Sequence, residues 1–398
     1  MEVLKDKIRK LSVDYLQEII DVRRHLHAYP ELSNQEYKTS EYICNILDQY
    51  GIPYTSGIFN TGIVALIEGK KPASKVVALR ADMDALPIHE KNEVSYCSKN
   101  EGVMHACGHD VHMSSLLGAA KILNTLKDDF EGTIKLIFQP AEEKSPGGAK
   151  FMIEEGVLEN PKPEVIYGQH VYPELEAGKV GMKPGKYMAS TDEIEIKVKG
   201  KGGHAAMPFA VIDPIVIASQ IIVSLQQIVS RKAHINVPTV LSFGQFIADG
   251  TYNVIPDEVN IKGTFRTFDE EWRARALDMI VNMSKTIAEG AGAECEVYIG
   301  HGYPYLVNDD ELTMKAFDTA VDYLGKENVV KLDMRATGED FAYFAQAMPA
   351  CFYRLGIKNE EKGIQSNLHT PTFDIDEKSL ETGMGLLAWL ALKELVEK

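Results

Sequence analysis

The sequence is short of positive charge. Its 398 residues include 42 lysines and arginines against 58 aspartates and glutamates, which gives a formal net charge of −16. A surface of this sign repels the phosphates of nucleic acids and the headgroups of anionic membranes. We therefore expect neither nucleic acid nor a membrane as a partner.

The sequence also has few cysteines and no long apolar run. Residues Met1–Lys10 carry mixed charges without the apolar segment of a signal peptide, and no stretch reaches the roughly 20 apolar residues of a membrane span. The cysteines are odd in number and widely spaced, which argues against a disulfide framework. They are Cys44, Cys97, Cys107, Cys295 and Cys351. These absences predict a cytoplasmic protein in which any functional cysteine acts as a thiolate.

Length and composition favour a folded protein of two domains. Hydrophobic residues make up 45% and charged residues 25% of the chain, which is ordinary for a globular protein. A chain of 398 residues exceeds what a single hydrophobic core usually supports.

The first half of the sequence alternates helices with short apolar strands. Helical spacing covers Leu4–Tyr29, and Asn34 is expected to cap a second helix that ends at Tyr50. Strands and helices are then predicted at Ile63–Ile67, Val76–Leu79, Val111–Leu126, Thr133–Phe138, Gly148–Glu155 and Val165–Tyr167. This alternation is typical of an α/β domain with a mostly parallel central sheet.

The pattern changes near residue 187. Glu193–Lys199 alternates polar and apolar residues, as a strand with one solvated face does. A helix, two strands, a helix and a strand follow: Ile215–Val229, Thr239–Ile247, Glu258–Thr267, Glu270–Glu289 and Glu294–Ile299. The β-α-β-β-α-β order predicts a smaller ferredoxin-like α+β domain over 187–301. It would interrupt a discontinuous first domain of 1–186 and 302–398.

The segment Met104–His112 contains three histidines, one cysteine and one aspartate between a predicted strand and a predicted helix. Cys107 and His109 are two residues apart, so on extended or turn backbone both can point to one ion. A thiolate and an imidazole are good ligands for zinc and related metals. The alternative, a polar helix start with a buried cysteine, stays open on this segment alone.

Other acidic and histidine side chains follow predicted strands. Glu142 and Glu143 come after Thr133–Phe138, and His170 follows Val165–Tyr167. Open α/β sheets bind ligands where their parallel strands end. Neighbouring glutamates point in different directions, so one could bind metal while the other takes a proton from water. Glutamate pairs are also common on solvated surfaces, and it is the shared position at strand ends that favours a site.

Further candidates have weaker support. Asp82 and Asp84 lie on one side of an extended chain, where one could orient a metal-bound histidine; ordinary loop acids are the alternative. His204 is flanked by small residues at a strand end and could donate to an oxyanion, or simply belong to a hairpin turn. Asn253 and Arg266 are candidate substrate contacts. Arg266 is suited to a substrate carboxylate, because arginine binds carboxylates well.

Together these motifs resemble the M20 metallopeptidase family, and within it the aminoacylase and hippurate hydrolase branch. The resemblance runs nearly end to end. It rests on Arg23–His27 with Pro30–Leu32, Arg80–Pro87, Met104–His112, Gln139–Glu143, Gly202–Ala205 and Gly338–Phe341.

The resemblance implies a zinc-peptidase-like catalytic domain interrupted by a lid or dimerisation domain. It implies Glu142 as general base, Asp84 as the residue that orients a metal ligand, and one or two divalent ions of zinc, manganese, cobalt or nickel. The implied metal ligands are Cys107, His109, Glu143, His170 and His369.

The implied reaction is hydrolysis of the amide bond of N-acyl-L-amino acids, such as N-acetyl, hippurate-like or N-acetyl-diaminopimelate-like substrates. In family members that dimerise, the histidine matching His204 reaches the partner's site, so a homodimer through the lid domain is expected. The alternatives are a di- or tripeptidase of the same superfamily and a metal-dependent binding module without turnover.

Overall fold

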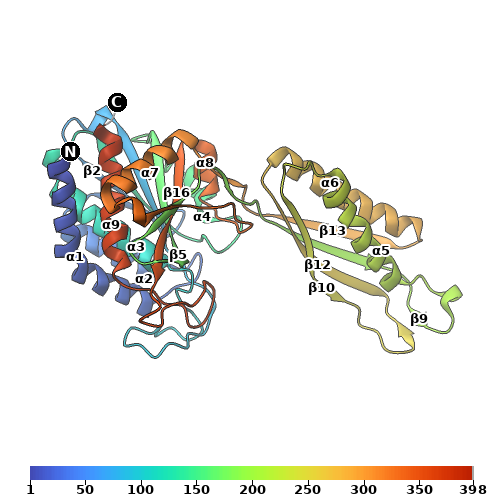
Figure 1. The fold of residues 1–398 in the computed structure, drawn as a ribbon. Helices are drawn as coiled ribbons and strands as arrows, with labels where there is room; N and C mark the ends of the chain where they lie inside the picture. Colours follow the sequence, from blue (N-terminus) through green and yellow to red (C-terminus); the bar gives the residue numbers. More distant parts are fainter. Residues whose placement is uncertain (397–398) are drawn as a thin grey trace. The chain divides into compact units, whose positions relative to one another are not determined.

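The computed structural model describes residues 1–396, which fold as two compact units (Figure 1). The first unit comprises Met1–Tyr187, Val307–Met334 and the chain from Asp340 onward. The second comprises Met188–Leu306 and the short segment Arg335–Glu339. This segment joins the second unit through its backbone, since the Ala189 amide donates to the carbonyl oxygens of Arg335 and Thr337 at 3.1 Å.

The first unit is built on an eight-stranded sheet with the order β1-β2-β4-β3-β5-β16-β6-β15. Its central neighbours β4, β3, β5 and β16 run parallel, which confirms the predicted α/β class with a mostly parallel sheet. Every residue of β3 and β4 is buried, as expected for strands covered on both faces. The strands are β1 (Tyr54–Ile58), β2 (Gly62–Glu68), β3 (Val76–Asp82), β4 (Thr133–Gln139), β5 (Val165–Glu176), β6 (Val180–Met182), β15 (Val329–Lys331) and β16 (Ala350–Lys358).

Helices far apart in the sequence pack together on this sheet. The first helix, α1 (Glu2–Ala28), contacts both α3 (His109–Thr125) and α9 (Ser379–Val396), and the last two pack against β3 (Figure 1). Fourteen of the 17 residues of α3 are buried, so its start is held firmly at the end of the sheet. The remaining helices of this unit are α2 (Tyr37–Tyr50), α4 (Gly148–Glu154), α7 (Asp310–Leu324) and α8 (Ala342–Ala347).

One predicted helix cap is wrong. Helix α2 begins at Tyr37, and Asn34 lies in the preceding loop with a φ of 66°. Glu36 occupies the cap position, but its side chain makes no capping bond and instead accepts the Asn34 amide at 3.0 Å. The same carboxylate also accepts the backbone amide of Ala141, in the turn after β4.

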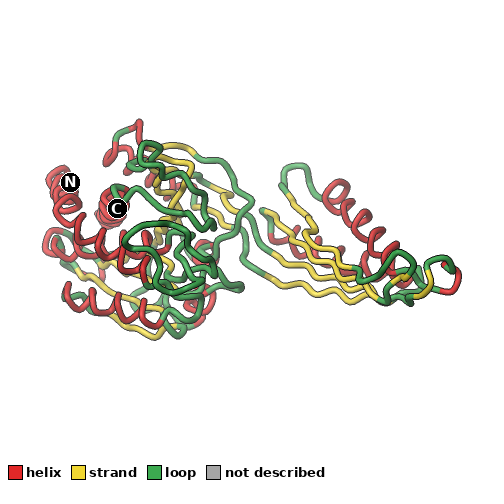
Figure 2. The backbone as a smooth tube through the Cα atoms, turned by 90° about the horizontal axis from the view of Figure 1, so that it is seen from below, coloured by secondary structure: helices red, strands yellow, loops and turns green. Residues whose placement is uncertain are grey.

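The second unit is a four-stranded antiparallel sheet with the order β10-β12-β8-β13. Two helices pack along one face of this sheet (Figure 2). Each is capped by an aspartate, Asp213 or Asp269, that accepts backbone amides of the first turn. This is the predicted ferredoxin-like order. The elements are β8 (Asp192–Lys199), α5 (Pro214–Gln227), β10 (Thr239–Ile247), β12 (Glu258–Thr267), α6 (Glu270–Gly290) and β13 (Glu294–His301).

One helical segment of the second unit differs from the expectation that no stretch is long and apolar enough to span a membrane. Pro214–Lys232, which is α5 with the π-helical segment Ile228–Lys232 that follows it, is long and apolar enough by length and composition to do so. It is the one such helix among residues 1–396. Core helices of soluble proteins pass the same test, and α5 packs on its sheet through Ile217, Ile221 and Leu225.

Candidate metal centre

The candidate site lies where the parallel strands of the first unit end. β3 ends at Asp82 and β4 at Gln139, and α3 begins at His109. His170 was predicted to follow a short strand, but β5 is longer and His170 lies inside it, paired in register with Arg354 of β16. Its side chain nevertheless reaches the same cluster.

The structure brings the five predicted ligand side chains together. The Cys107 Sγ lies 3.5 Å from the His170 Nε2 and 3.4 Å from the His369 Nε2. The Glu143 Oε1 is 3.4 Å from the His369 Nε2 and 3.9 Å from the His109 Nε2. Two triplets follow, each with ligand atoms within 4.8 Å of one another: Cys107, His109, His170 and Cys107, Glu143, His369. Cys107 belongs to both.

His109 shows that a cation fits this cluster. Its imidazole is fully buried, and neither ring nitrogen makes a well-formed hydrogen bond within the described chain. Carboxylate oxygens lie close by, with Asp84 Oδ1 at 3.3 Å from Nδ1 and Asp82 Oδ2 at 3.8 Å from Nε2. Burial alone would lower the pKa of His109, but the charges of Asp82, Asp84 and Glu143 raise it to about 10. The site therefore favours positive charge at this position.

Cys107 favours the neutral thiol in this site, but its sulfur is suited to bind a metal ion. Burial and the nearby charges of Glu143 and Glu142 hold the pKa of the Cys107 thiol well above its usual value. A bound divalent cation reverses this balance, because it stabilises the thiolate directly.

Two neighbouring histidines are held in different states. The His112 Nδ1 lies 2.5 Å from Asp82 Oδ1, and its Nε2 accepts the Val171 amide at 2.9 Å, so no lone pair remains for a metal. The His170 Nδ1 lies 2.8 Å from the Val171 carbonyl oxygen and donates to it, which leaves the Nε2 lone pair facing Cys107. Of the two, only His170 can act as a ligand.

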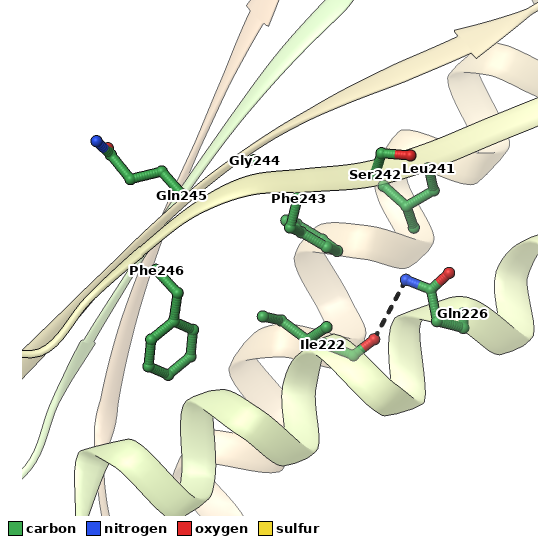
Figure 3. Close-up of a pocket in the computed structure, with 8 residues that line it drawn as sticks. All are labelled: Ile222, Gln226, Leu241, Ser242, Phe243, Gly244, Gln245 and Phe246. Atoms are coloured by element: carbon green, nitrogen blue, oxygen red, sulfur yellow. Dashed lines mark hydrogen bonds between the residues drawn. The ribbon is translucent and has the colours of Figure 1, made fainter.

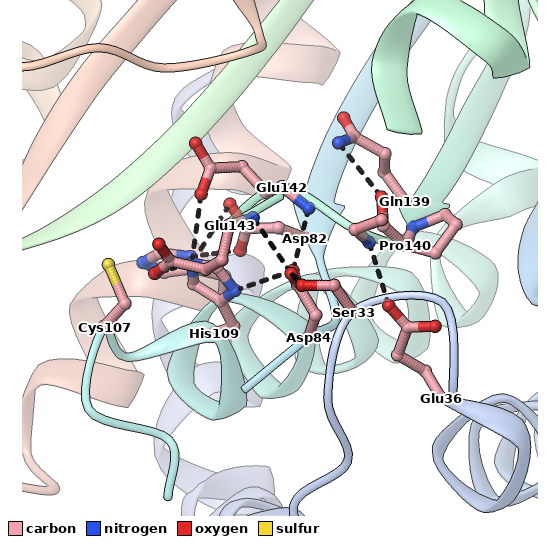
Figure 4. A network of polar contacts seen from close by, with 12 residues as sticks. Ser33, Glu36, Asp82, Asp84, Cys107, His109, Gln139, Pro140, Glu142 and Glu143 are labelled. Atoms are coloured by element: carbon pink, nitrogen blue, oxygen red, sulfur yellow. Dashed lines mark hydrogen bonds and ion pairs between the residues drawn. The ribbon is translucent and has the colours of Figure 1, made fainter. Parts of the chain in front are cut away.

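Asp84 holds the segment that carries the two glutamates (Figure 4). Its buried carboxylate accepts the backbone amides of Glu142 at 3.0 Å and Glu143 at 2.9 Å, and the Ser33 hydroxyl at 2.6 Å. The Glu142 carboxylate is nearly buried, and its Oε2 lies 4.0 Å from the His109 Nε2. Glu142 therefore lies beside the five predicted ligands, and it also forms a triplet with His109 and Glu143 whose ligand atoms lie within 4.8 Å of one another.

A buried ion-pair network beneath the site was not predicted. Arg80 donates to Asp82 at 2.7 Å, to Asp340 at 2.8 Å and to Gln139 at 2.8 Å. It fixes Asp82, which in turn holds His112. The available signal was a charged pair, Arg80 and Asp82, at the end of an otherwise apolar strand.

The structure places His204, Asn253 and Arg266 in the second unit. His204 is exposed on the short strand β9 (Gly203–His204), and the carbonyl oxygen of Asn253 accepts the amide of its neighbour Ala205 at 3.0 Å. Arg266 is partly buried on β12, where burial lowers its pKa despite the charges of Asp192 and Glu193. His204 and Asn253 thus lie side by side, whereas Arg266 occupies another strand.

The fold is that of an α/β metallopeptidase, with a candidate metal cluster where its parallel strands end. The chain belongs to peptidase family M20/M25/M40, whose sequence pattern matches residues 78–393. The predicted resemblance to this family is confirmed.

Individual relatives match this chain over 77% of its length or more. The N-acyl-L-amino acid amidohydrolase of Geobacillus stearothermophilus is 45% identical over 77% of this chain and 82% of its own length. The N-acetyl-L-cysteine deacetylase of Bacillus subtilis is 39% identical over 95% of this chain and 88% of its own. Among solved structures, the Bacillus subtilis YXEP protein, described as a dinuclear metal-binding peptidase of the M20 family, matches with a TM-score of 0.81 and 36% identity, over 96% of this chain and 99% of its own.

Proposed function

We propose that this protein is a metal-dependent amidohydrolase that cleaves N-acyl-L-amino acids into a carboxylic acid and a free amino acid. The observation that carries the proposal is the buried His109 imidazole, which lies among ligand side chains without a well-formed hydrogen bond and has the Glu142 carboxylate beside it. The names of two relatives at 39% and 45% identity support this substrate class. N-acetyl, hippurate-like and N-acetyl-diaminopimelate-like compounds are the candidates to test.

Cys107, His109 and His170 would hold one divalent ion, and Cys107, Glu143 and His369 a second. Cys107 would then be a shared ligand. When bound, such ions supply a Lewis acid that lowers the pKa of water and polarises the substrate carbonyl. The mixture of thiolate, imidazole and carboxylate suits zinc, manganese, cobalt or nickel.

The protein's own groups manage the proton and the geometry. Glu142 takes a proton from the attacking water and passes it to the leaving amine. Asp84 orients His109 and, through two backbone bonds, Glu142 and Glu143.

Three residues of the second unit complete the proposed roles. His204 would donate to the oxyanion, and Asn253 and Arg266 would bind the substrate carboxylate. We place them as functional residues on their chemistry and on the family resemblance.

We further propose that the protein is a cytoplasmic homodimer formed through its second unit. Helix α5 exposes Val216 and Val223 at 62% and 71%. Strand β10 is an edge strand with no outer partner within residues 1–396, and it exposes Phe246 and Ile247. A pocket lies between them, with both apolar and polar side chains in its lining: Ile222, Gln226 and Leu241–Phe246 (Figure 3). A second copy would cover this apolar face and pair the open edge.

The test of the proposed chemistry is Glu142→Gln. The variant should keep the metal content of the native protein while kcat falls by roughly 100- to 10,000-fold, because the amide cannot accept the proton. Glu154→Gln, on the exposed face of α4, is the matched control and should retain full activity. Unchanged turnover of the Glu142 variant would refute its role as base.

The rival function is a di- or tripeptidase, which the description of the YXEP relative as a peptidase favours. A substrate panel of N-acyl amino acids and free dipeptides, with each of the four metals in turn, separates the two. Metal-restored cleavage of dipeptides but not of N-acetyl amino acids would support the peptidase. Metal binding without any turnover would support a binding module.

A further inference from the structure

The loop between α1 and α2 is tied to the segment that carries Glu142. Three successive backbone amides, those of Ala141, Glu142 and Glu143, donate to two buried carboxylates (Figure 4). The last two donate to Asp84, whereas the Ala141 amide donates to the Oε1 of Glu36 at 2.9 Å. The turn is therefore fixed at its start by a residue outside the proposed catalytic set.

This turn needs external support. Ala141 has a φ of 55°, in the left-handed region, where a residue with a side chain is strained. On its far side, the Ala141 carbonyl oxygen accepts the Gly148 amide at 3.0 Å. Ala141 is thus held on both sides, by Glu36 through its amide and by Gly148 through its carbonyl.

Glu36 is itself held rigidly. Its side chain is fully buried, its Oε1 also accepts the Asn34 amide at 3.0 Å, and its Oε2 accepts the Thr61 hydroxyl at 3.0 Å. A carboxylate with three fixed donors cannot turn away from the Ala141 amide without leaving them unpaired.

Helix capping does not explain Glu36. The residue occupies the cap position of α2, yet its side chain makes no bond to the first turn of that helix. Its carboxylate accepts the Asn34 amide in its own loop, the Thr61 hydroxyl just before β2 and the Ala141 amide in the turn after β4. The bond to the Ala141 amide connects it to the site.

We propose that Glu36 is a positioning residue for the proposed active site, which sets the Ala141–Glu143 turn so that Glu142 and Glu143 lie beside His109. This inference rests on the proposed function. Glu143 belongs to the triplet of Cys107, Glu143 and His369 but not to that of Cys107, His109 and His170. A displaced turn should therefore weaken the ion held by Glu143 and leave the ion held by Cys107, His109 and His170 in place.

The experiment compares Glu36→Ala, Glu36→Gln and two control variants in the full-length protein. Glu36→Ala should lower kcat roughly 10- to 100-fold, the cost of misplacing a reacting group by about 1 Å. Zinc titration should show one of two ions bound more weakly. Glu36→Gln keeps an oxygen acceptor for the Ala141 amide and should restore most of kcat.

The controls separate positioning from stability. Glu31 lies in the same loop and accepts the amide and hydroxyl of Thr39 at 2.8 and 2.9 Å, so Glu31→Ala removes comparable bonds without touching the turn. Thr61→Val removes one bond to Glu36 and keeps the bond to Ala141. Both should lower the unfolding temperature with kcat nearly unchanged.

The outcomes are distinguishable. A Glu36→Ala variant that folds and keeps native kcat and both ions overturns the inference, and so does an equal loss of kcat in Glu31→Ala. If Glu36→Ala does not fold, Glu36→Asp takes its place, because the shorter carboxylate keeps its charge but is drawn away from the Ala141 amide. Native kcat with both ions bound in that variant also overturns the inference. A native protein that binds no zinc and hydrolyses no substrate refutes the proposed function itself.

Discussion

Single side chains in the candidate site have pKa values that are moved far from their usual range. His109 is pushed toward the charged form by three carboxylates, whereas Cys107 in the same cluster is pushed toward the neutral thiol. Burial is the largest cause of the Cys107 shift and opposes the His109 shift, whereas nearby carboxylates raise both pKa values. A divalent cation would balance this buried negative charge. Because Cys107 belongs to both triplets, its thiolate would be stabilised from two sides.

Glu36 offers a pH test at the residue scale. Burial and the charge of Asp84, offset in part by backbone amides, raise its pKa from 4.5 to about 7. The unfolded chain therefore loses this proton first, and Glu36 costs the folded state stability as pH rises from 4.5 to 7. Glu36→Gln has no such titratable group. Its free energy of unfolding, minus that of the native protein, should therefore increase as the pH rises from 4.5 to 7.

Urea unfolding at several pH values, with equal metal content in both proteins, measures this difference. The absolute stability of Glu36→Gln is not the readout, since the amide changes the local hydrogen bonds. A difference that stays constant from pH 4.5 to 7 would contradict the raised pKa.

At the scale of elements, α1 holds the loop that carries His369. Arg23 is fully buried and donates to Asp374 at 2.9 Å and to Asp110, the residue after His109, at 2.8 Å. The Tyr96 hydroxyl also donates to Asp374, at 2.8 Å. His369 itself is half exposed and has a φ of 59°, so the loop depends on such contacts for its conformation.

We expect Asp374→Asn to weaken the ion held by His369 roughly 10-fold or more, as loss of supporting contacts around metal ligands does. Arg23 keeps Asp110 as a partner, so the variant should still fold. Asp376→Asn is the control, since its side chain lies in the same loop but binds Asn359 and Lys362. Zinc titration by calorimetry provides the measurement, and equal affinities for the two variants would contradict the prediction.

The elements that the sequence predicts well are those with strong periodicity. The antiparallel order of the second unit and the buried strands β3 and β4 follow directly from the spacing of apolar residues. Strands such as β6 and β15 are three residues long and carry no usable pattern. The bounds of β5 were missed because polar His170 lies inside the strand.

The sequence predicts the candidate metal ligands but not the residues that hold them in position. Cys107 and His109 lie in a compact polar segment at the start of α3, and Glu143 follows β4, as residue types and spacing alone can show. The strand predicted before this segment is wrong, since in the described chain only isolated β-bridges lie between β3 and α3. The bonds of Glu36 to Ala141 and of Arg23 to Asp374 join positions 105 and 351 residues apart. No local pattern specifies such pairs, since each depends on the finished packing of several elements.

For the whole molecule, metal removal should destabilise the two units unequally. The candidate ligands all lie in the first unit, where four carboxylates, those of Asp82, Asp84, Glu142 and Glu143, would lose their counter-charge. Chelation should lower the unfolding temperature, and added zinc should restore it. Hydrogen exchange should rise in β3 and β4 and stay unchanged in β8 and β13. Equal protection loss in both sheets would contradict a site confined to the first unit.

The division of the chain also sets an order for folding during synthesis. The sheet of the second unit is contiguous in sequence and can close once β13 has left the ribosome. The first unit must wait, because β16 pairs with β5 only after residue 350 and α9 covers α3 and β3 last of all. Until then, the strands that carry the candidate ligands lack part of their cover, and nascent chains are exposed to aggregation at this stage. The first unit, which would bind the metal ions, is thus the last to form.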